Sequence, residues 1–146
     1  AGIKYSNYYE PNPGLNSNRA VFYDFTTDTN SFNGWVEAGG AGGELEYTLD
    51  ILMCAKDMAP TACPGLYIAL ATDEDSDSIP SVTPATEEVA MALTQAGCIV
   101  FIDPATTSLV SYYEPLAVNG GAVEQEAGNI GWFRYENMRQ RILSGQ

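Results

Sequence analysis

The chain has 146 residues, of which 45% are hydrophobic and 17% are charged, and its 6 Lys and Arg stand against 19 Asp and Glu, for a formal net charge of −13. This length and composition predict one folded, soluble domain and exclude disorder over the whole chain. The net charge argues against binding to nucleic acid or to an anionic membrane surface, because both need clusters of cations. No apolar run approaches the roughly 18 residues of a membrane span.

Residues 1–18 are predicted to form an extended N-terminal arm. They are rich in Tyr, Asn, Pro and Gly and show neither a helical nor an alternating period. Proline holds the backbone near extended geometry, and tyrosine offers a large apolar face with a polar tip. We expect this arm to lie across a neighbouring surface, with three anchors: Tyr5, Tyr8 and Tyr9.

Residues 19–129 are predicted to form a single, mainly β domain, an antiparallel sandwich or a barrel with one short helix near 84–96. An α+β fold is the alternative. The strands are expected where the composition is β-rich or apolar side chains alternate, namely at 19–26, 44–51, 65–72, 98–103 and 108–113. The connections favour two antiparallel hairpins, one formed by the second and third of these strands and one by the last two.

The helix near 84–96 has the clearest local signals. Thr83 is suited to cap it, and Pro84 suits the first helical position. Glu87 and Glu88 favour the positive end of the helix dipole, and apolar residues recur at helical spacing before Gly97.

The C-terminal segment, 130–146, reverses the charge of the rest of the chain. It holds three Arg against one Glu, whereas residues 1–129 hold three cations against 18 acids. This complementarity predicts a contact either with the rest of the same chain or with a neighbouring copy. The residues expected to bind a partner here are Trp132, Phe133, Arg134, Arg139 and Arg141.

The three cysteines leave two interpretations open. Cys54 and Cys63 flank a short connection and are a possible disulfide in an oxidising compartment, which leaves Cys98 as a buried thiol. The alternative is three reduced, mostly buried thiols. A zinc site is disfavoured, because the chain has no His and no CxxC pair.

The candidate chemistry is sparse. The absence of histidine removes Ser-His-Asp and Cys-His catalysis and most transition-metal sites, so we expect no enzyme, no catalytic residue and no cofactor. Asp73, Asp75 and Asp77 alternate like the start of a calcium loop. Ser78 and Pro84 then stand where an EF-hand loop needs Gly and Glu, so a weak calcium site competes with a solvated acidic loop.

Residues 23–35, YDFTTDTNSFNGW, resemble the opening of jelly-roll carbohydrate-binding modules, which pair an aromatic-acidic strand with a Gly-Trp. The resemblance covers 13 residues and implies a secreted sugar-binding β-sandwich. A sugar-stacking platform built from large aromatics is the related hypothesis, against their use in the core or in interfaces. The aromatics concerned are Trp35, Trp132, Tyr112 and Tyr113.

These features predict a non-enzymatic assembly subunit that binds neighbouring protein subunits through its arm and its C-terminal segment. The composition resembles that of proteins in virion shells and cell-surface filaments, and within that class a phage capsid decoration or cement subunit is favoured. A pilus subunit and a secreted carbohydrate-binding module are the alternatives. The expected location is a virion or the cell surface, with secretion as the alternative, and a homo-oligomer is possible.

Overall fold

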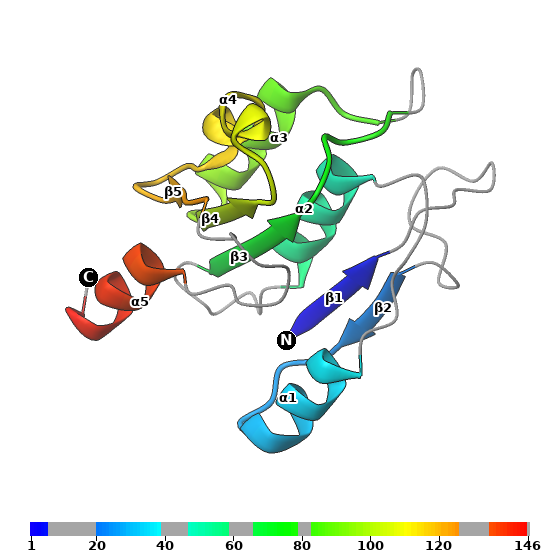
Figure 1. Ribbon diagram of the computed structural model, residues 1–146, viewed down its shortest axis with the longest axis vertical. Coiled ribbons are helices and arrows are strands. Elements are labelled where there is room, and N and C mark those ends of the chain that lie inside the picture. The colour runs from blue at the N-terminus through cyan, green and yellow to red at the C-terminus, as the bar shows by residue number, and fades with distance from the viewer. Residues whose placement is uncertain (6–19, 39–46, 59–65, 79–82, 126–134, 146) are drawn as a thin grey trace.

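The computed structural model describes residues 1–5, 20–38, 47–58, 66–78, 83–125 and 135–145 (Figure 1). In chain order their elements are β1 (Gly2–Tyr5), β2 (Ala20–Tyr23), α1 (Thr29–Glu37), α2 (Thr48–Asp57), β3 (Tyr67–Thr72), α3 (Thr86–Gln95), β4 (Ile99–Pro104), the 3-10 helix η1 (Thr107–Leu109), α4 (Val110–Tyr113), the 3-10 helix η2 (Glu114–Leu116), β5 (Ala122–Val123) and α5 (Glu136–Leu143).

The predicted mainly β fold, an antiparallel sandwich or barrel, is wrong. The described residues form five α-helices, a two-stranded antiparallel sheet of β1 and β2, and a three-stranded parallel sheet in the order β3-β4-β5. The architecture is α+β, which was the alternative. Both predicted hairpins are wrong as well, because the described parts of their partner segments, 44–51 and 108–113, are helical; β3 and β4 pair with each other in parallel through the connection that contains α3.

Two segments predicted as strands, 44–51 and 108–113, are helical where the structure describes them. The apolar pattern of each segment fits both the two-residue period of a strand and the 3.6-residue period of a helix. In α2 the buried side chains include Thr48, Ile51 and Leu52, which recur at helical spacing. The segment 108–113 belongs to η1 and α4, and its Tyr113 packs inward together with Leu116 three residues later. The strands predicted at 19–26, 65–72 and 98–103 and the helix near 84–96 are confirmed as β2, β3, β4 and α3.

The core lies between the parallel sheet and the helices packed against it. β3 contributes alternate side chains to it, and β4 is buried along nearly its whole length, as is usual for parallel strands covered on their faces. Helices α2 and α3 pack against each other, and α3 also packs against η2 (Figure 1). The buried cluster consists of Leu49, Leu52, Ile68, Leu70, Val89, Leu93, Cys98, Val100, Ile102, Tyr113 and Leu116.

A second, smaller group of side chains joins the hairpin of β1 and β2 to α1. The α1 helix begins where Asp28 accepts a hydrogen bond from the Ser31 amide. The rings of Tyr23, Phe32 and Trp35 then pack together, with centroids 5.3 to 5.9 Å apart. The segment that resembles a jelly-roll opening is therefore partly helical, and the β-sandwich that the resemblance implied is wrong.

The turn between η2 and β5 is built around close backbone approach. Asn119 and Gly120 have positive φ angles of 56° and 81°, and the Asn119 side-chain amide donates to the Thr94 and Cys98 carbonyls. At Gly121 a Cβ atom would lie 1.8 Å from the Val100 carbonyl oxygen. Only glycine fits there while β5 keeps its pairing with β4.

We expect Gly121→Ala to lower the free energy of unfolding by about 2–3 kcal/mol, because the added methyl group forces the turn away from β4. Gly34→Ala in α1 is the matched control, since a Cβ there meets nothing within 4 Å. The control should gain up to about 1 kcal/mol from helix propensity. Urea unfolding of both variants measures the difference, and equal stabilities would show that the turn yields to the methyl group.

Candidate functional site

The candidate site lies at the carboxyl edge of the parallel sheet. β3 and β4 run in the same direction, so both of their carboxyl ends reach this edge, where ligands of open α/β sheets bind. β3 continues directly into residues 73–77, Asp-Glu-Asp-Ser-Asp, which we call the acidic loop. Asp103, which is fully buried, lies near the end of β4.

The core tyrosine Tyr113 holds the start of the acidic loop. Its side chain is fully buried, and its hydroxyl donates to the Glu74 carbonyl oxygen over 2.6 Å. The Thr72 hydroxyl donates to the same carbonyl over 2.9 Å. One loop carbonyl thus accepts two hydrogen bonds from buried side chains, which fixes the backbone at the point where β3 ends.

Ser76 provides a second attachment of the acidic loop. Its amide donates to the Tyr112 hydroxyl over 3.3 Å, and its own hydroxyl accepts from the Leu49 amide over 3.1 Å. Leu49 lies in the first turn of α2, where the amides have no partner within the helix. The loop therefore caps α2 from outside while the neighbouring rings of Tyr112 and Tyr113 support it, with their centroids 4.8 Å apart.

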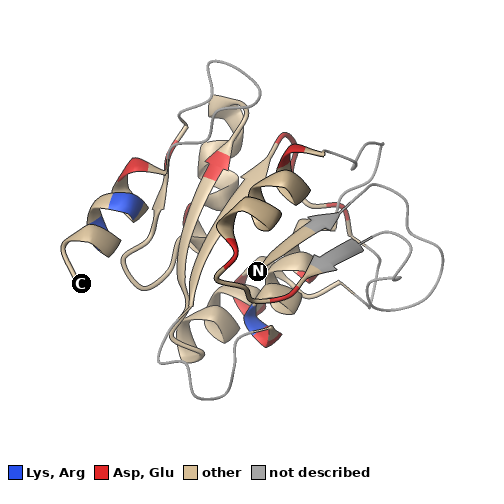
Figure 2. Cartoon of the chain, turned by 90° about the horizontal axis from the view of Figure 1, so that it is seen from below, with Lys and Arg blue, Asp and Glu red and all other residues tan. Residues whose placement is uncertain are grey.

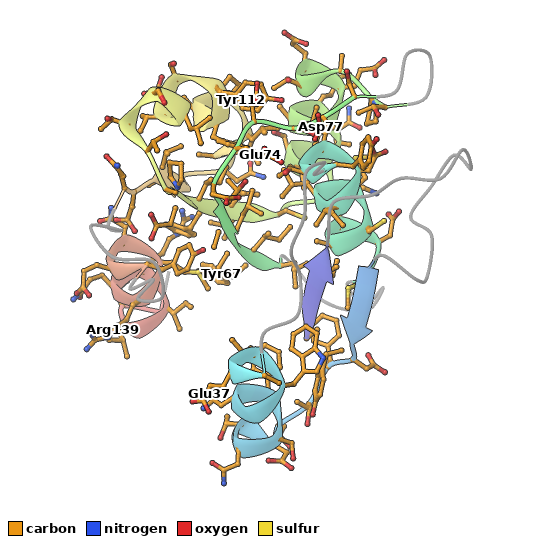
Figure 3. All side chains as sticks on the ribbon, turned by 45° about the vertical axis from the view of Figure 1, so that its right-hand side comes forward. Glu37, Tyr67, Glu74, Asp77, Tyr112 and Arg139 are labelled. Carbon is orange, nitrogen blue, oxygen red and sulfur yellow. The ribbon has the colours of Figure 1, made fainter. Side chains whose placement is uncertain are left out.

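Figure 3 shows Glu74, Asp77 and Tyr112 together on the side of the molecule where α2 and the acidic loop lie. Burial, and after it the charges of Asp77, Asp73 and Asp75, raises the pKa of Glu74. Its Oε1 atom is buried, and no described group donates a hydrogen bond to it. The loop therefore holds one carboxylate that is less stable in its ionised form than an exposed glutamate.

Tyr113 acts as a neutral hydrogen-bond donor. Burial raises its pKa to about 12, and the hydroxyls of Thr72 and Thr48 oppose part of that rise. A phenol with this pKa stays protonated at neutral pH, so it donates to the loop carbonyl and cannot serve as a base. Its role is to position the loop.

The carboxylates of the acidic loop do not converge in the described geometry. In the part of the chain that the structure describes, no three His, Cys, Asp or Glu side chains gather closely enough to hold a metal ion. The calcium interpretation of Asp73, Asp75 and Asp77 therefore gains no support. What the arrangement does provide is a fixed, strongly negative surface, which attracts cationic groups of a partner.

Neither described cysteine is set up as a nucleophile. Cys54 in α2 and Cys98 before β4 form no disulfide with each other among the described residues, and burial is the main cause that raises the pKa of each thiol. Asp57 and Asp50 raise the pKa of Cys54 further. Cys63 lies outside the described residues, so a disulfide between Cys54 and Cys63 stays a prediction.

The predicted partner-binding residues fall into two groups. Arg139 and Arg141 lie in α5, and Tyr5 lies in β1, which pairs with β2, so the first residues of the predicted arm are part of a hairpin. The others are outside the described residues: Tyr8, Tyr9, Trp132, Phe133 and Arg134. Of the predicted residues that the structure describes, the two arginines share one helix, α5, although they lie on different sides of it.

The α5 helix is attached to the domain by polar contacts at both of its ends. At its start, the Asn137 amide donates to both carboxylate oxygens of Glu124, which follows β5. Near its end, Arg141 donates to the carbonyls of Asn119 and Gly120, at 3.0 and 2.6 Å. Arg141 thus makes the contact within the chain that the charge asymmetry allowed for.

The outward side of α5 stays in solvent. No residue of this helix is buried, and Ile142 and Leu143 are 49% and 69% exposed. Arg139 is four residues before Leu143, on the same side of the helix, and among the described residues it pairs with the neighbouring Glu136 at 3.5 Å. An apolar and cationic surface therefore stands on a strongly acidic protein, and Figure 2 shows the blue parts of the α5 ribbon near the C-terminus, away from most of the red ones.

The large aromatics do not form one platform. Trp35 packs beside the β1–β2 hairpin, whereas Tyr112 and Tyr113 lie in α4 and support the acidic loop. Tyr113 is fully buried and so offers no face to a sugar. Trp132 lies outside the described residues.

The roles of Tyr113, Ser76 and Glu124 were missed from the sequence. One signal was present, namely a buried strand, a helix and a second buried strand in succession, which is typical of parallel pairing and would have put the acidic loop at a ligand-binding edge. The hydrogen bonds of Tyr113 to a loop some 40 residues earlier had no local signal. In the described ranges, no helix is long and apolar enough to cross a membrane.

The raised pKa of Tyr113 predicts a loss of stability at alkaline pH. The unfolded chain releases this proton near the ordinary value of 10, while the folded chain keeps it until about 12. The contribution is therefore complete below pH 10 and is lost as the pH rises to 12. Urea unfolding across this range should show a steeper decline for the native chain than for Tyr113→Phe; parallel curves would contradict the assignment.

Burial of Glu74 predicts the opposite behaviour on the acid side. Because its pKa is raised, the ionised form costs stability, and that cost disappears as the pH falls and the group takes up a proton. We expect Glu74→Gln to raise Tm by a few degrees at pH 7 and by nothing at pH 3. Glu114→Gln, at an exposed acid that starts η2, is the control, and an equal effect of both variants would mean that only net charge matters.

Comparison of the chain with protein-family models, with characterised proteins and with solved structures finds no match. The proposed function therefore rests on the geometry described above and on the sequence.

Proposed function

We propose that the chain is a non-enzymatic assembly subunit that binds neighbouring protein subunits, with α5 as a principal contact. The observation that carries this proposal is the combination of firm attachment and exposure in α5. Contacts from Glu124 and Arg141 hold the helix in one orientation, while Ile142 and Leu143 remain in solvent.

An eight-residue helix needs such external support. Isolated helices shorter than about 12–15 residues are marginal in water, and most helices in proteins are stabilised by burying an apolar face. α5 buries no residue within the described chain, so its polar attachments do part of this work. A partner that covers Ile142 and Leu143 would supply the rest, and exposed apolar side chains beside a cation are typical of interface anchors.

The charge distribution supports an acidic partner surface. Arg139 has 65% of its side chain exposed and has only one weak, exposed ion pair, with Glu136. The remainder of the chain is strongly acidic. A second copy therefore offers acidic surfaces that complement α5, as does any shell or filament protein of similar composition.

The chemistry of the described residues supports binding over catalysis. The chain has no histidine, the thiols of Cys54 and Cys98 have raised pKa values, and Tyr113 serves as a buried donor. Composition favours the shell of a virion or a cell surface as the assembly in which the subunit acts, as a capsid decoration protein would. The carbohydrate-binding alternative has lost the β-sandwich on which it depended.

We expect Leu143→Asp to weaken self-association, or binding to a shell protein, by about tenfold or more, because a charge then replaces the most exposed apolar anchor of α5. Met91→Asp, at an exposed apolar residue of α3, is the matched control and should have little effect. Sedimentation velocity over a concentration series measures this. An equal response of the two variants would exclude α5 as the specific contact.

A further inference from the structure

We propose that the outer edge of β3 binds an extended, apolar peptide segment of a partner protein, with cationic residues at the end that meets the acidic loop. This inference goes beyond the assembly role of α5, since it rests on a different element and different contacts. It is carried by the direction of the β3 backbone, by the composition of that strand and by the charges that follow it.

The hydrogen bonds of the sheet show which backbone groups of β3 face outward. Ile99 donates to the Leu66 carbonyl over 2.8 Å, and Ala105 donates to the Thr72 carbonyl over 2.8 Å. With the parallel register of β3 and β4, even-numbered residues of β3 therefore bond to β4. The amides and carbonyls of Ala69 and Ala71 point to the opposite edge, where no described strand pairs with β3.

The two edges of the parallel sheet differ in their protection. β5 forms one edge and is only two residues long, which limits pairing with any further strand. β3 forms the other with six residues, Tyr-Ile-Ala-Leu-Ala-Thr, none of which is charged or a proline. Proteins usually block an open edge with charge, proline or a bulge, so an edge of this composition is suited to strand addition.

The side chains along this edge leave room for a peptide backbone. Ala69 is exposed and Ala71 is half-buried, and neither side chain extends beyond a methyl group. Figure 1 shows β4 on one side of β3 and the β1–β2 hairpin on the other side in this view, as a separate pair of strands that does not pair with β3. Backbone pairing at Ala69 and Ala71 would give affinity, and alternate side chains of the added strand would lie on the two faces of the sheet.

The acidic loop determines the charge of the added strand at one end. Four carboxylates occur within the five residues after Thr72, and hydrogen bonds from Tyr113 and Ser76 hold their backbone in place. A peptide that pairs with β3 therefore ends beside Asp73 and its neighbours. Lys or Arg is favoured at that end of the added strand. The β3 segment of a second copy is disfavoured, because it would bring further carboxylates and no cation.

The test uses the full chain and two synthetic peptides of alternating Thr and Val, one with two Arg at its N-terminus and one with two Arg at its C-terminus. An antiparallel strand brings the first arginine pair to the acidic loop, and a parallel strand brings the second. We expect one peptide to bind at least tenfold more tightly than the other, and binding to disappear when Glu replaces both Arg. Equal or undetectable binding of the two peptides overturns the proposal.

Ala69→Pro separates edge pairing from general attraction to an acidic protein. Proline is tolerated at an edge position whose amide faces outward, so the variant should fold and retain the β3–β4 ladder. It should lose at least tenfold in affinity for the preferred peptide, whereas Met91→Asp, at an exposed apolar residue of α3, should bind as the native chain does. Unchanged affinity of Ala69→Pro overturns the proposal.

Hydrogen exchange measured by NMR provides a readout that does not depend on a variant. The amides of Ala69 and Ala71 should exchange quickly in the chain alone and slow at least tenfold when the preferred peptide is present. If these two amides exchange slowly without peptide at every protein concentration, a segment of the same chain occupies the edge. Protection that appears only at high protein concentration would mean that a second copy does, and either result overturns the proposal.

Discussion

The parallel pairing of β3 with β4 is the constraint on which the rest of the structure depends. Two parallel neighbours need a crossover, which α3 provides, and their side chains must be covered, which α2, α3 and η2 do on the side of the main core. The same pairing brings the end of β3 and the end of β4 to one edge. The acidic loop, the buried Asp103 and the supporting tyrosines of α4 meet there as a result.

Polar side chains and amides from other elements hold the loops at the ends of these strands. In the described chain, polar contacts from distant elements fasten two loops: Tyr113 and the Leu49 amide hold the acidic loop, and Arg141 of α5 holds the turn before β5, which Asn119 also ties to Cys98. Each contact satisfies a backbone carbonyl or amide that would otherwise lie near the core without a partner. Side chains that look like surface residues in the sequence thus serve as internal supports.

The sequence predicted those elements in which composition and period agree. Near-continuous apolar runs identified β3 and β4, and capping residues with helical spacing identified α3. The prediction failed where one apolar pattern fits both a strand and a helix. The alternation that ends in Leu49 and Ile51 indicates a strand, but Ile51 and Leu52 also lie on one face of a helix. Strand pairing was the larger error, since β3 and β4 were each expected to form a hairpin with a neighbouring segment, 44–51 or 108–113, and instead pair with each other in parallel. For the candidate site, the acidic residues were visible, but their attachment to Tyr113 depends on tertiary packing.

The charged residues divide the surface into an acidic region at the loop after β3 and a cationic, apolar region at α5. Neutral donors, the hydroxyl of Tyr113 and the amide of Leu49, hold the acidic loop against the core without cancelling its charge. α5 shows the reverse arrangement, in which Arg141 is used to attach the helix and Arg139 remains exposed beside apolar side chains. If Arg141 were exposed, α5 would lose its contact with the Asn119 and Gly120 carbonyls. If Arg139 and Arg141 both pointed inward, the outward side of α5 would carry no cation. Under the proposed assembly function, the positions of these few cations determine where the acidic chain would meet its neighbours.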